Sequence, residues 1–318
     1  MTLRVVFFGN SDSTFSNRHY AALAAAPCQI VGVVDVPPAR RISTNTRAVG
    51  AGPSFAAQAA ACGVQAFEPA SPNTLEFVES IRRLAPDLFI AAGYMSLLKP
   101  DILGVPSLLA ANFHASLLPA YRGKHPVFWA LRNGERRTGL TVHIMDPHFD
   151  TGEILYQVRV RTRRRDTVSS LYDRIMEQSV PLVRRLIEDA QAERHTSRPQ
   201  PVEGASYYSS PKDEDFRLDW RREAEELRRW IHVSPGRCFA EIRGGCVYFV
   251  DAKVRRGRGS SGPGTVLFVG SKVAEIEAGK DALRVARVKT SDGAERDCAD
   301  LFREMGIKVG TILSTAAA

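Results

Sequence analysis

The sequence predicts an α/β protein, with a Rossmann-like, mainly parallel sheet followed by a small OB-like β-barrel. Three observations lead to this prediction. Apolar runs alternate with helical stretches over the first 190 residues or so, a stretch rich in Pro, Gln, Arg and Ser follows, and short β-prone runs with Gly-rich breaks fill the rest. A chain of 318 residues also exceeds one ordinary core. We therefore expect a first domain at 1–191, a linker at 192–206 and a second domain at 207–318.

The first domain should alternate strands and helices. Residues 3–8 are apolar, β-branched and aromatic, and the helical stretch 15–26 follows the turn at 9–13. That turn lacks Gly-x-Gly-x-x-Gly, which weakens a dinucleotide-binding or dehydrogenase reading. The other expected elements are strands 30–36, 64–67, 87–92, 108–115, 139–145 and 153–160, and helices 55–62, 71–84 with Ser71 as its cap, 126–133, and 167–191 with a kink or restart at Pro181.

The second domain should be a small barrel. We expect a helix at 220–232 and strands at 239–242, 247–254, 264–269, 273–276 and 283–288. From Gly204 onward the chain has 20 Lys and Arg against 17 Asp and Glu. The resulting net positive charge is smaller than expected for a domain whose main function is to bind the phosphates of a nucleic acid.

Composition narrows the functional class. With 44% hydrophobic and 25% charged residues, no apolar run long enough for a bilayer and no leader-like N-terminus, the sequence predicts a cytoplasmic protein without a membrane partner. Five scattered cysteines indicate neither disulfides nor a zinc site. The net charge of +8 suits an anionic partner but also fits a basic protein that binds none.

One strand end concentrates chemistry. Asn112 and His114 lie two residues apart on a predicted strand, so they share a face, and the following turn places them at its carboxyl end, where open α/β sheets bind ligands. Taken singly, each residue is more often a structural group. Their combination with Asp150-Thr-Gly152 favours a catalytic site.

The motif Asn-x-His-x-Ser-Leu-Leu-Pro-x-Tyr-Arg-Gly at 112–123, with Asp-x-Gly at 150–152, resembles the signature of the folate-dependent formyltransferases. The resemblance covers nearly the whole chain and implies 10-formyltetrahydrofolate as co-substrate and an amine as acceptor. It also implies that the second domain resembles an OB fold.

Transfer of a formyl group to an amine passes through a tetrahedral oxyanion. Asn112 is suited to donate to that oxyanion, and His114 to relay a proton or to donate as well; the sequence leaves these two roles of His114 open. A carboxylate at Asp150 would orient the imidazole.

By resemblance, the folate-contacting residues are Tyr94, Met95, Ser116, Leu117, Leu118, Pro119, Lys124, Asp146, Pro147, His148 and Phe149. The residues also allow a purely structural interpretation, in which Pro119 shapes a turn and Lys124 is a solvated surface residue. No His, Cys and carboxylate spacing indicates a metal, so His125, His143 and His148 receive no ligand role.

The acceptor is the open question. Residues 231–242 lack the Trp-Pro of the tRNA enzymes, 207–220 are closer to the sugar enzymes, and 123–129 depart from the tRNA pattern. These features favour a small-molecule amine, such as an amino-sugar nucleotide or hydroxyornithine. The full-length second domain and the basic loop with Arg40, Arg41 and Arg47 support the alternative, methionyl-tRNA.

A further alternative is a non-catalytic nucleotide- or RNA-binding homologue. The intact set of Asn112, His114 and Asp150 argues against it, because a binding module needs no such trio. The sequence does not set the oligomeric state.

Overall fold

The computed structural model describes residues 2–37, 54–257 and 261–313. The chain divides into two compact units. The first comprises 1–129, 136–163 and 168–209, and the second comprises 130–135, 164–167 and 210–318. The basic loop with Arg40, Arg41 and Arg47 lies outside the described residues.

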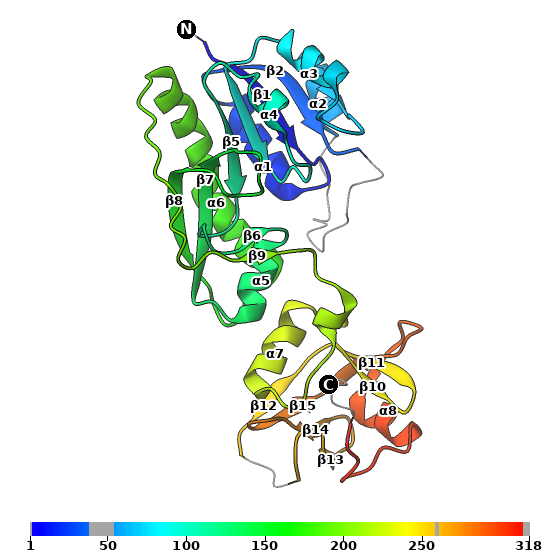
Figure 1. Ribbon diagram of the computed structural model, residues 1–318. Helices are drawn as coiled ribbons and strands as arrows, with labels where there is room; N and C mark the ends of the chain where they lie inside the picture. Colours follow the sequence, from blue (N-terminus) through cyan, green and yellow to red (C-terminus); the bar gives the residue numbers. More distant parts are fainter. Residues whose placement is uncertain (1, 38–53, 258–260, 314–318) are drawn as a thin grey trace. The chain divides into compact units, whose positions relative to one another are not determined.

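A seven-stranded sheet forms the centre of the first unit (Figure 1). Its order is β3-β2-β1-β4-β5-β7-β8; the first five strands in this order are parallel, and β7 is antiparallel to both of its neighbours, β5 and β8. The strands are β1 (Arg4–Gly9), β2 (Gln29–Asp35), β3 (Gln65–Phe67), β4 (Leu88–Ala92), β5 (Leu109–His114), β7 (Arg137–Ile144) and β8 (Ile154–Arg161). The prediction of a mainly parallel sheet is therefore confirmed.

Helices cover both faces of this sheet, as parallel strands require. They are α1 (Thr14–Ala24), α2 (Phe55–Ala61), α3 (Leu75–Arg82), α4 (Pro100–Leu103) and α6 (Val168–Gln191). Helix α5 (Pro126–Asn133) has its first four residues in the first unit and its last four in the second. On β5, Ala110 belongs to the core cluster under α3 and α4, whereas the Phe113 ring lies 4.9 Å from that of His19 on α1. Because side chains alternate along a strand, Asn112 and His114 share the α3–α4 face with Ala110.

Two helices differ from the expectation. Helix α3 begins at Leu75, capped by Thr74, whose hydroxyl accepts from the Phe77 N–H, so the predicted start at Ser71 is wrong. The Ser71 hydroxyl instead accepts from the Asn73 N–H in a turn. Helix α6 runs through Pro181 as one 24-residue helix rather than restarting there. Within the described part of the chain, no helix combines the length and apolarity of a membrane span.

The second unit contains two four-stranded antiparallel sheets, β10-β11-β16-β17 and β12-β15-β14-β13. Its strands are β10 (Phe239–Ile242), β11 (Gly245–Phe249), β12 (Lys253–Arg255), β13 (Val266–Val269), β14 (Ala274–Glu277), β15 (Ala282–Val285), β16 (Arg287–Lys289) and β17 (Glu295–Asp297), with helices α7 (Ala224–Val233) and α8 (Cys298–Glu304). One residue separates β15 from β16, so the chain passes directly from one sheet to the other. The strand predicted at 247–254 is split into β11 and β12. Trp220, Phe249 and Phe302 are fully buried in this unit, and the predicted fold class is confirmed.

Residues 192–209 belong to the first unit. In this stretch β9 (Tyr207–Tyr208) pairs in parallel with β6 (Arg122–Gly123), which forms the end of the sequence motif at 112–123. Ser206, the last residue of the predicted linker, accepts from the Tyr121 and Arg122 N–H groups, so this segment is hydrogen bonded to the loop that follows β5. The domain boundaries themselves stay a prediction.

Candidate active site

Strands β5 and β7 bring three polar side chains together. Asn112 lies opposite His143 and His114 lies opposite Thr141 in the antiparallel pairing of these strands. Residues directly opposite one another in such a pair point to the same face. Asn112, His114 and His143 therefore start from one surface of the sheet.

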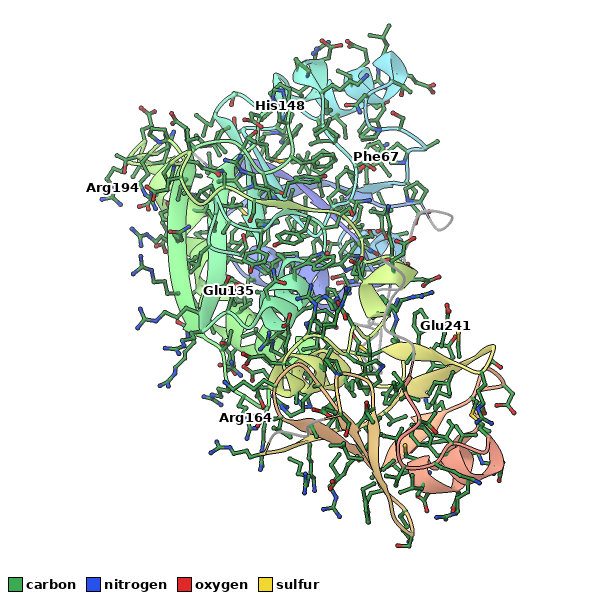
Figure 2. All side chains as sticks on the ribbon, turned by 60° about the horizontal axis from the view of Figure 1, so that its bottom comes forward. Phe67, Glu135, His148, Arg164, Arg194 and Glu241 are labelled. Atoms are coloured by element: carbon green, nitrogen blue, oxygen red, sulfur yellow. The ribbon has the colours of Figure 1, made fainter. Side chains whose placement is uncertain are left out.

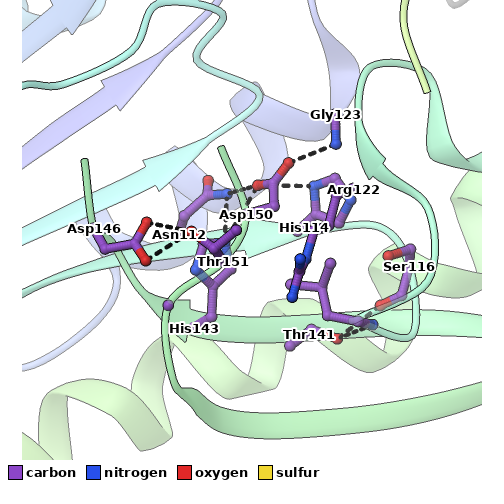
Figure 3. Close-up of polar contacts among 12 residues, drawn as sticks. Asn112, His114, Ser116, Arg122, Gly123, Thr141, His143, Asp146, Asp150 and Thr151 are labelled. Atoms are coloured by element: carbon purple, nitrogen blue, oxygen red, sulfur yellow. Dashed lines mark hydrogen bonds and ion pairs between the residues drawn. The ribbon is translucent and has the colours of Figure 1, made fainter. Parts of the chain in front are cut away.

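The loop between β7 and β8 returns Asp150 to this surface (Figure 3). Asp150 Oδ1 lies 3.3 Å from His114 Nδ1, 3.3 Å from Asn112 Nδ2 and 3.4 Å from His143 Nε2. The Gly123 N–H donates to Asp150 Oδ2 at 2.8 Å. Asp150 has a left-handed backbone, with φ at 59°, which Asp tolerates better than most residues. The three residues predicted from the sequence are therefore in contact, with Asn112 and His114 both next to the Asp150 carboxylate.

Backbone carbonyls orient both imidazoles. His114 Nε2 lies 2.8 Å from the Tyr121 carbonyl oxygen, and His143 Nδ1 lies 2.9 Å from that of Ile144. Because a carbonyl oxygen only accepts, each of these nitrogens must carry a hydrogen. His114 then faces an acceptor at both nitrogens, since the Asp150 carboxylate lies at the other one. A positively charged His114 can donate to both.

The Asn112 amide is fully engaged. Its Nδ2 lies 3.1 Å from His143 Nε2 and 3.3 Å from Asp150 Oδ1, so its two hydrogens serve these two acceptors. Donation to a substrate oxygen would require one of these hydrogen bonds to be exchanged. His143 is the natural one to release, because a neutral acceptor binds a hydrogen less strongly than a carboxylate.

The Asp150 carboxylate is buried, at 8% exposure, yet ionised. Burial acts to raise its pKa, but the charge of His114, the neighbouring His143 ring and the Gly123 N–H together hold the pKa well below its usual range. A permanent negative charge therefore lies between the two imidazoles.

The residues assigned to folate by resemblance fall into three places. Tyr94 and Met95 follow β4, which pairs with β5, so they leave the sheet beside His114; the Tyr94 ring packs edge-on against Phe8. Ser116, Leu117, Leu118, Pro119 and Lys124 form the turn after β5, and Asp146, Pro147, His148 and Phe149 form the loop before Asp150.

Two of these residues have structural partners. The Ser116 hydroxyl donates to the Ala120 carbonyl at 2.7 Å, and the Asp146 carboxylate accepts from the Thr151 hydroxyl at 2.7 Å. Both contacts stay within their own loop. Phe149 is different, because this residue is 39% exposed and directly precedes Asp150 in the chain.

His143 is the member of the site that sequence reasoning left without a role. Its one usable signal was the alternation of strand 139–145, which pairs it with Asn112 only once the antiparallel register is known. No group of three or more His, Cys, Asp or Glu in the described residues has the geometry of a metal site.

A carboxamide, two imidazoles and an ionised carboxylate at the edge of an α/β sheet are groups that can stabilise an oxyanion, as the transfer of an acyl or one-carbon group requires. Comparison with known families agrees. Residues 3–187 match the Formyl transferase family, and residues 211–306 match the Formyl transferase C-terminal domain. The chain belongs to the formyl transferase family, and its predicted class, a folate-dependent formyltransferase, is confirmed.

Similar proteins span the whole chain. A methionyl-tRNA formyltransferase of Acidithiobacillus ferrooxidans is 31% identical over 98% of both chains. One from Methylobacterium sp. is 32% identical over 99% of this chain and 100% of its own.

Solved structures share the fold. A Helicobacter canadensis N-formyltransferase, in complex with folinic acid and dTDP-3-aminofucose, matches with a TM-score of 0.63 and 14% identity over 91% of this chain and 100% of that one. HypX from Aquifex aeolicus with tetrahydrofolic acid matches with a TM-score of 0.60 and 18% identity over 97% and 48%. At these identities the likeness concerns the fold alone.

Proposed function

We propose that the protein transfers the formyl group of 10-formyltetrahydrofolate to the amine of methionyl-tRNA. The observation that carries this proposal is the similarity, at 31–32% identity and over both units, to proteins named methionyl-tRNA formyltransferase. The site supports the reaction, because it gathers donors and an ionised carboxylate around one point.

This acceptor replaces the small-molecule amine favoured by the sequence motifs. The departures at 123–129, 207–220 and 231–242 remain. They are short, however, whereas the similarity to the tRNA enzymes extends over 312 residues. The N-formyltransferase of Helicobacter canadensis, in complex with dTDP-3-aminofucose, is 14% identical, so its likeness concerns the fold alone.

Each member of the trio has one task in this proposal. Attack of the amine nitrogen on the formyl carbon turns the carbonyl oxygen into an oxyanion, which Asn112 Nδ2–H and a protonated His114 stabilise. Asp150 fixes the orientation of His114 through its contact with Nδ1. The bond from the formyl carbon to the folate nitrogen then breaks, and the proton lost by the amine ends on that nitrogen, so a formyl group and a proton change places.

The surroundings fit a folate. The co-substrate supplies the activated formyl group, and its flat pterin needs apolar and aromatic neighbours. Tyr94 and Met95 at the end of β4 offer such neighbours on one side of His114, and the exposed ring of Phe149 offers another next to Asp150.

A polyanionic acceptor is supported by surface charge on the first unit. Arg137, Arg159 and Arg161 are exposed on β7 and the edge strand β8, and Arg137 lies opposite Arg161. Figure 2 shows nitrogen-tipped side chains along this edge. Arginines on an edge strand can also serve to prevent aggregation, so their exposure alone does not show that they bind RNA. The salt dependence of KM for the tRNA tests that role.

The decisive experiment is a turnover assay with 10-formyltetrahydrofolate and three acceptors: methionyl-tRNA, amino-sugar nucleotides and hydroxyornithine. We expect saturable turnover on methionyl-tRNA alone, with KM rising steeply with salt. Turnover on a sugar nucleotide or hydroxyornithine but not on charged tRNA would refute the proposed acceptor. Folate binding without turnover on any amine would favour a non-catalytic homologue.

A further inference from the structure

Gln200 joins two loops of the candidate active site. Its side-chain Nε2 donates to the carbonyl oxygens of Asp150, at 2.9 Å, and Gly152, at 2.7 Å. Its Oε1 accepts from Arg122 Nε at 3.2 Å and from Arg122 Nη2 at 2.7 Å. The amide therefore uses both hydrogens and both lone pairs. One side of this amide holds the loop that carries Asp150, and the other holds the segment that carries Gly123.

Gln200 belongs to a segment, residues 198–208, that we call the strap. At one end, Arg198 exchanges two backbone hydrogen bonds with Ile154, at 2.8 and 3.0 Å. At the other end, the Ser206 hydroxyl accepts from the Tyr121 N–H at 2.9 Å, and the Ser206 carbonyl accepts from the Arg122 N–H at 2.9 Å. The strap is thus fastened to β8 and to the loop after β5.

The two loops that the strap holds are those that orient His114. Asp150 provides the carboxylate at His114 Nδ1, and Tyr121 provides the carbonyl oxygen at His114 Nε2. Both residues have left-handed backbones, with φ at 59° and 62°. Such conformations persist only where neighbouring contacts fix them. Gln200 contacts the Asp150 carbonyl directly, so it fixes the backbone from which the catalytic carboxylate projects.

We infer that Gln200 is a positioning residue for formyl transfer, acting through Asp150, and that the strap is part of the active-site architecture rather than a passive connection. The inference rests on the proposed function, because it concerns the same site. Loss of the Gln200 amide lets the Asp150 turn relax, and the distance from the carboxylate to His114 grows. A misplacement of about 1 Å in such a site lowers the rate by about 100-fold.

The competing explanation is that Gln200 only stabilises the fold. Gln191 offers a matched control, because its Nε2 donates to the Pro27 carbonyl at 2.7 Å within the same unit and away from the site. Gln200→Leu and Gln191→Leu each remove a glutamine side chain that donates hydrogen bonds to backbone carbonyl oxygens. A purely structural role predicts that both variants change stability and that neither changes kcat.

A double-mutant cycle with Asp150→Asn separates the two explanations on methionyl-tRNA. We expect Gln200→Leu to lower kcat by about 10- to 100-fold, Gln191→Leu to stay within about twofold of wild type, and the Gln200→Leu cost to shrink to about twofold in the Asp150→Asn background. An equal cost of Gln200→Leu in both backgrounds would overturn the inference. If Gln200→Leu does not fold, Gln200→Glu replaces it, because it keeps the shape and the acceptor for Arg122 but has no amide hydrogens.

Hydrogen–deuterium exchange tests the positioning role without turnover. We expect Gln200→Leu to accelerate exchange in residues 120–124 and 146–153 at least tenfold, and Gln191→Leu to leave both segments at the wild-type rate. Unchanged exchange in both segments would contradict the inference even if activity falls. If wild type formylates no tested amine, the proposed function fails, and the exchange experiment still decides whether Gln200 holds the Asp150 loop.

Discussion

Replacing Asp150 by Asn tests the central electrostatic contact of the site. The two side chains of the His114–Asp150 pair are 8% exposed, and their nearest atoms lie 3.3 Å apart. At an effective dielectric constant of about 20, opposite unit charges at this distance attract by about 5 kcal/mol. If His114 carries its positive charge against the oxyanion in the transition state, loss of this attraction lowers kcat by about 10³- to 10⁴-fold.

Asn is nearly isosteric and can still accept from the Gly123 N–H. Its amide group then faces His114 Nδ1, so a donor opposes a donor. Circular dichroism and urea unfolding should show a folded protein, and single-turnover kinetics with saturating folate should show the slow step. Asp189→Asn is the control, because the Asp189 carboxylate contacts Tyr156 and Arg185 on the same unit and not the trio. A variant within tenfold of the wild-type kcat would refute this reasoning.

Three other changes probe separate features. His19 is fully buried, and burial lowers its pKa to about 4, so as the pH falls from 6.5 towards 4 the unfolded chain binds a proton first and stability is lost. Urea unfolding should show that wild type loses about 3 kcal/mol more than His19→Gln between pH 7 and 4. A difference that does not depend on pH would contradict this. Asn112→Ala should lower kcat about 10²- to 10³-fold while calorimetry shows a folate Kd within about threefold, and parallel loss of affinity would count against an oxyanion role. Gly123→Ala should lower the free energy of unfolding, measured in urea, by about 2 kcal/mol or more. The reason is that φ of Gly123 is 93° and the new Cβ would lie 2.3 Å from the Tyr208 carbonyl oxygen. An unchanged midpoint of urea unfolding would be evidence against this strain.

The sequence predicted the strand that carries the site because its signal is local. Alternation alone puts Asn112 and His114 on one face of β5, and the turn chemistry after them marks the strand end. The start of α3 could not be read this way, because Ser71 and Thr74 are both good caps and the choice depends on Asn73, whose side chain accepts from the Lys99 N–H and donates to the Leu97 carbonyl.

The parts of the site that were not predicted depend on contacts distant in sequence. His143 reaches Asn112 only through the antiparallel pairing of β5 with β7, and nothing in the residues 139–145 states that direction. Gln200 lies in a stretch whose Pro and polar residues are typical of a linker, yet its amide finds three backbone and side-chain partners about 50 to 80 residues away. Composition indicates that such a segment lacks secondary structure of its own, but it does not indicate which distant residues the segment contacts in the folded protein.

The main chain supplies much of what fixes the two rings and the carboxylate: the carbonyl oxygens of Tyr121 and Ile144 and the N–H of Gly123. Every amino acid offers the same carbonyl group, whatever its side chain. Replacing the side chain of Ile144 therefore leaves the atom that holds His143 unchanged in kind. A site anchored in this way gives evolution, or a protein engineer, freedom to reshape its rim towards a new amine while the reacting centre keeps its geometry.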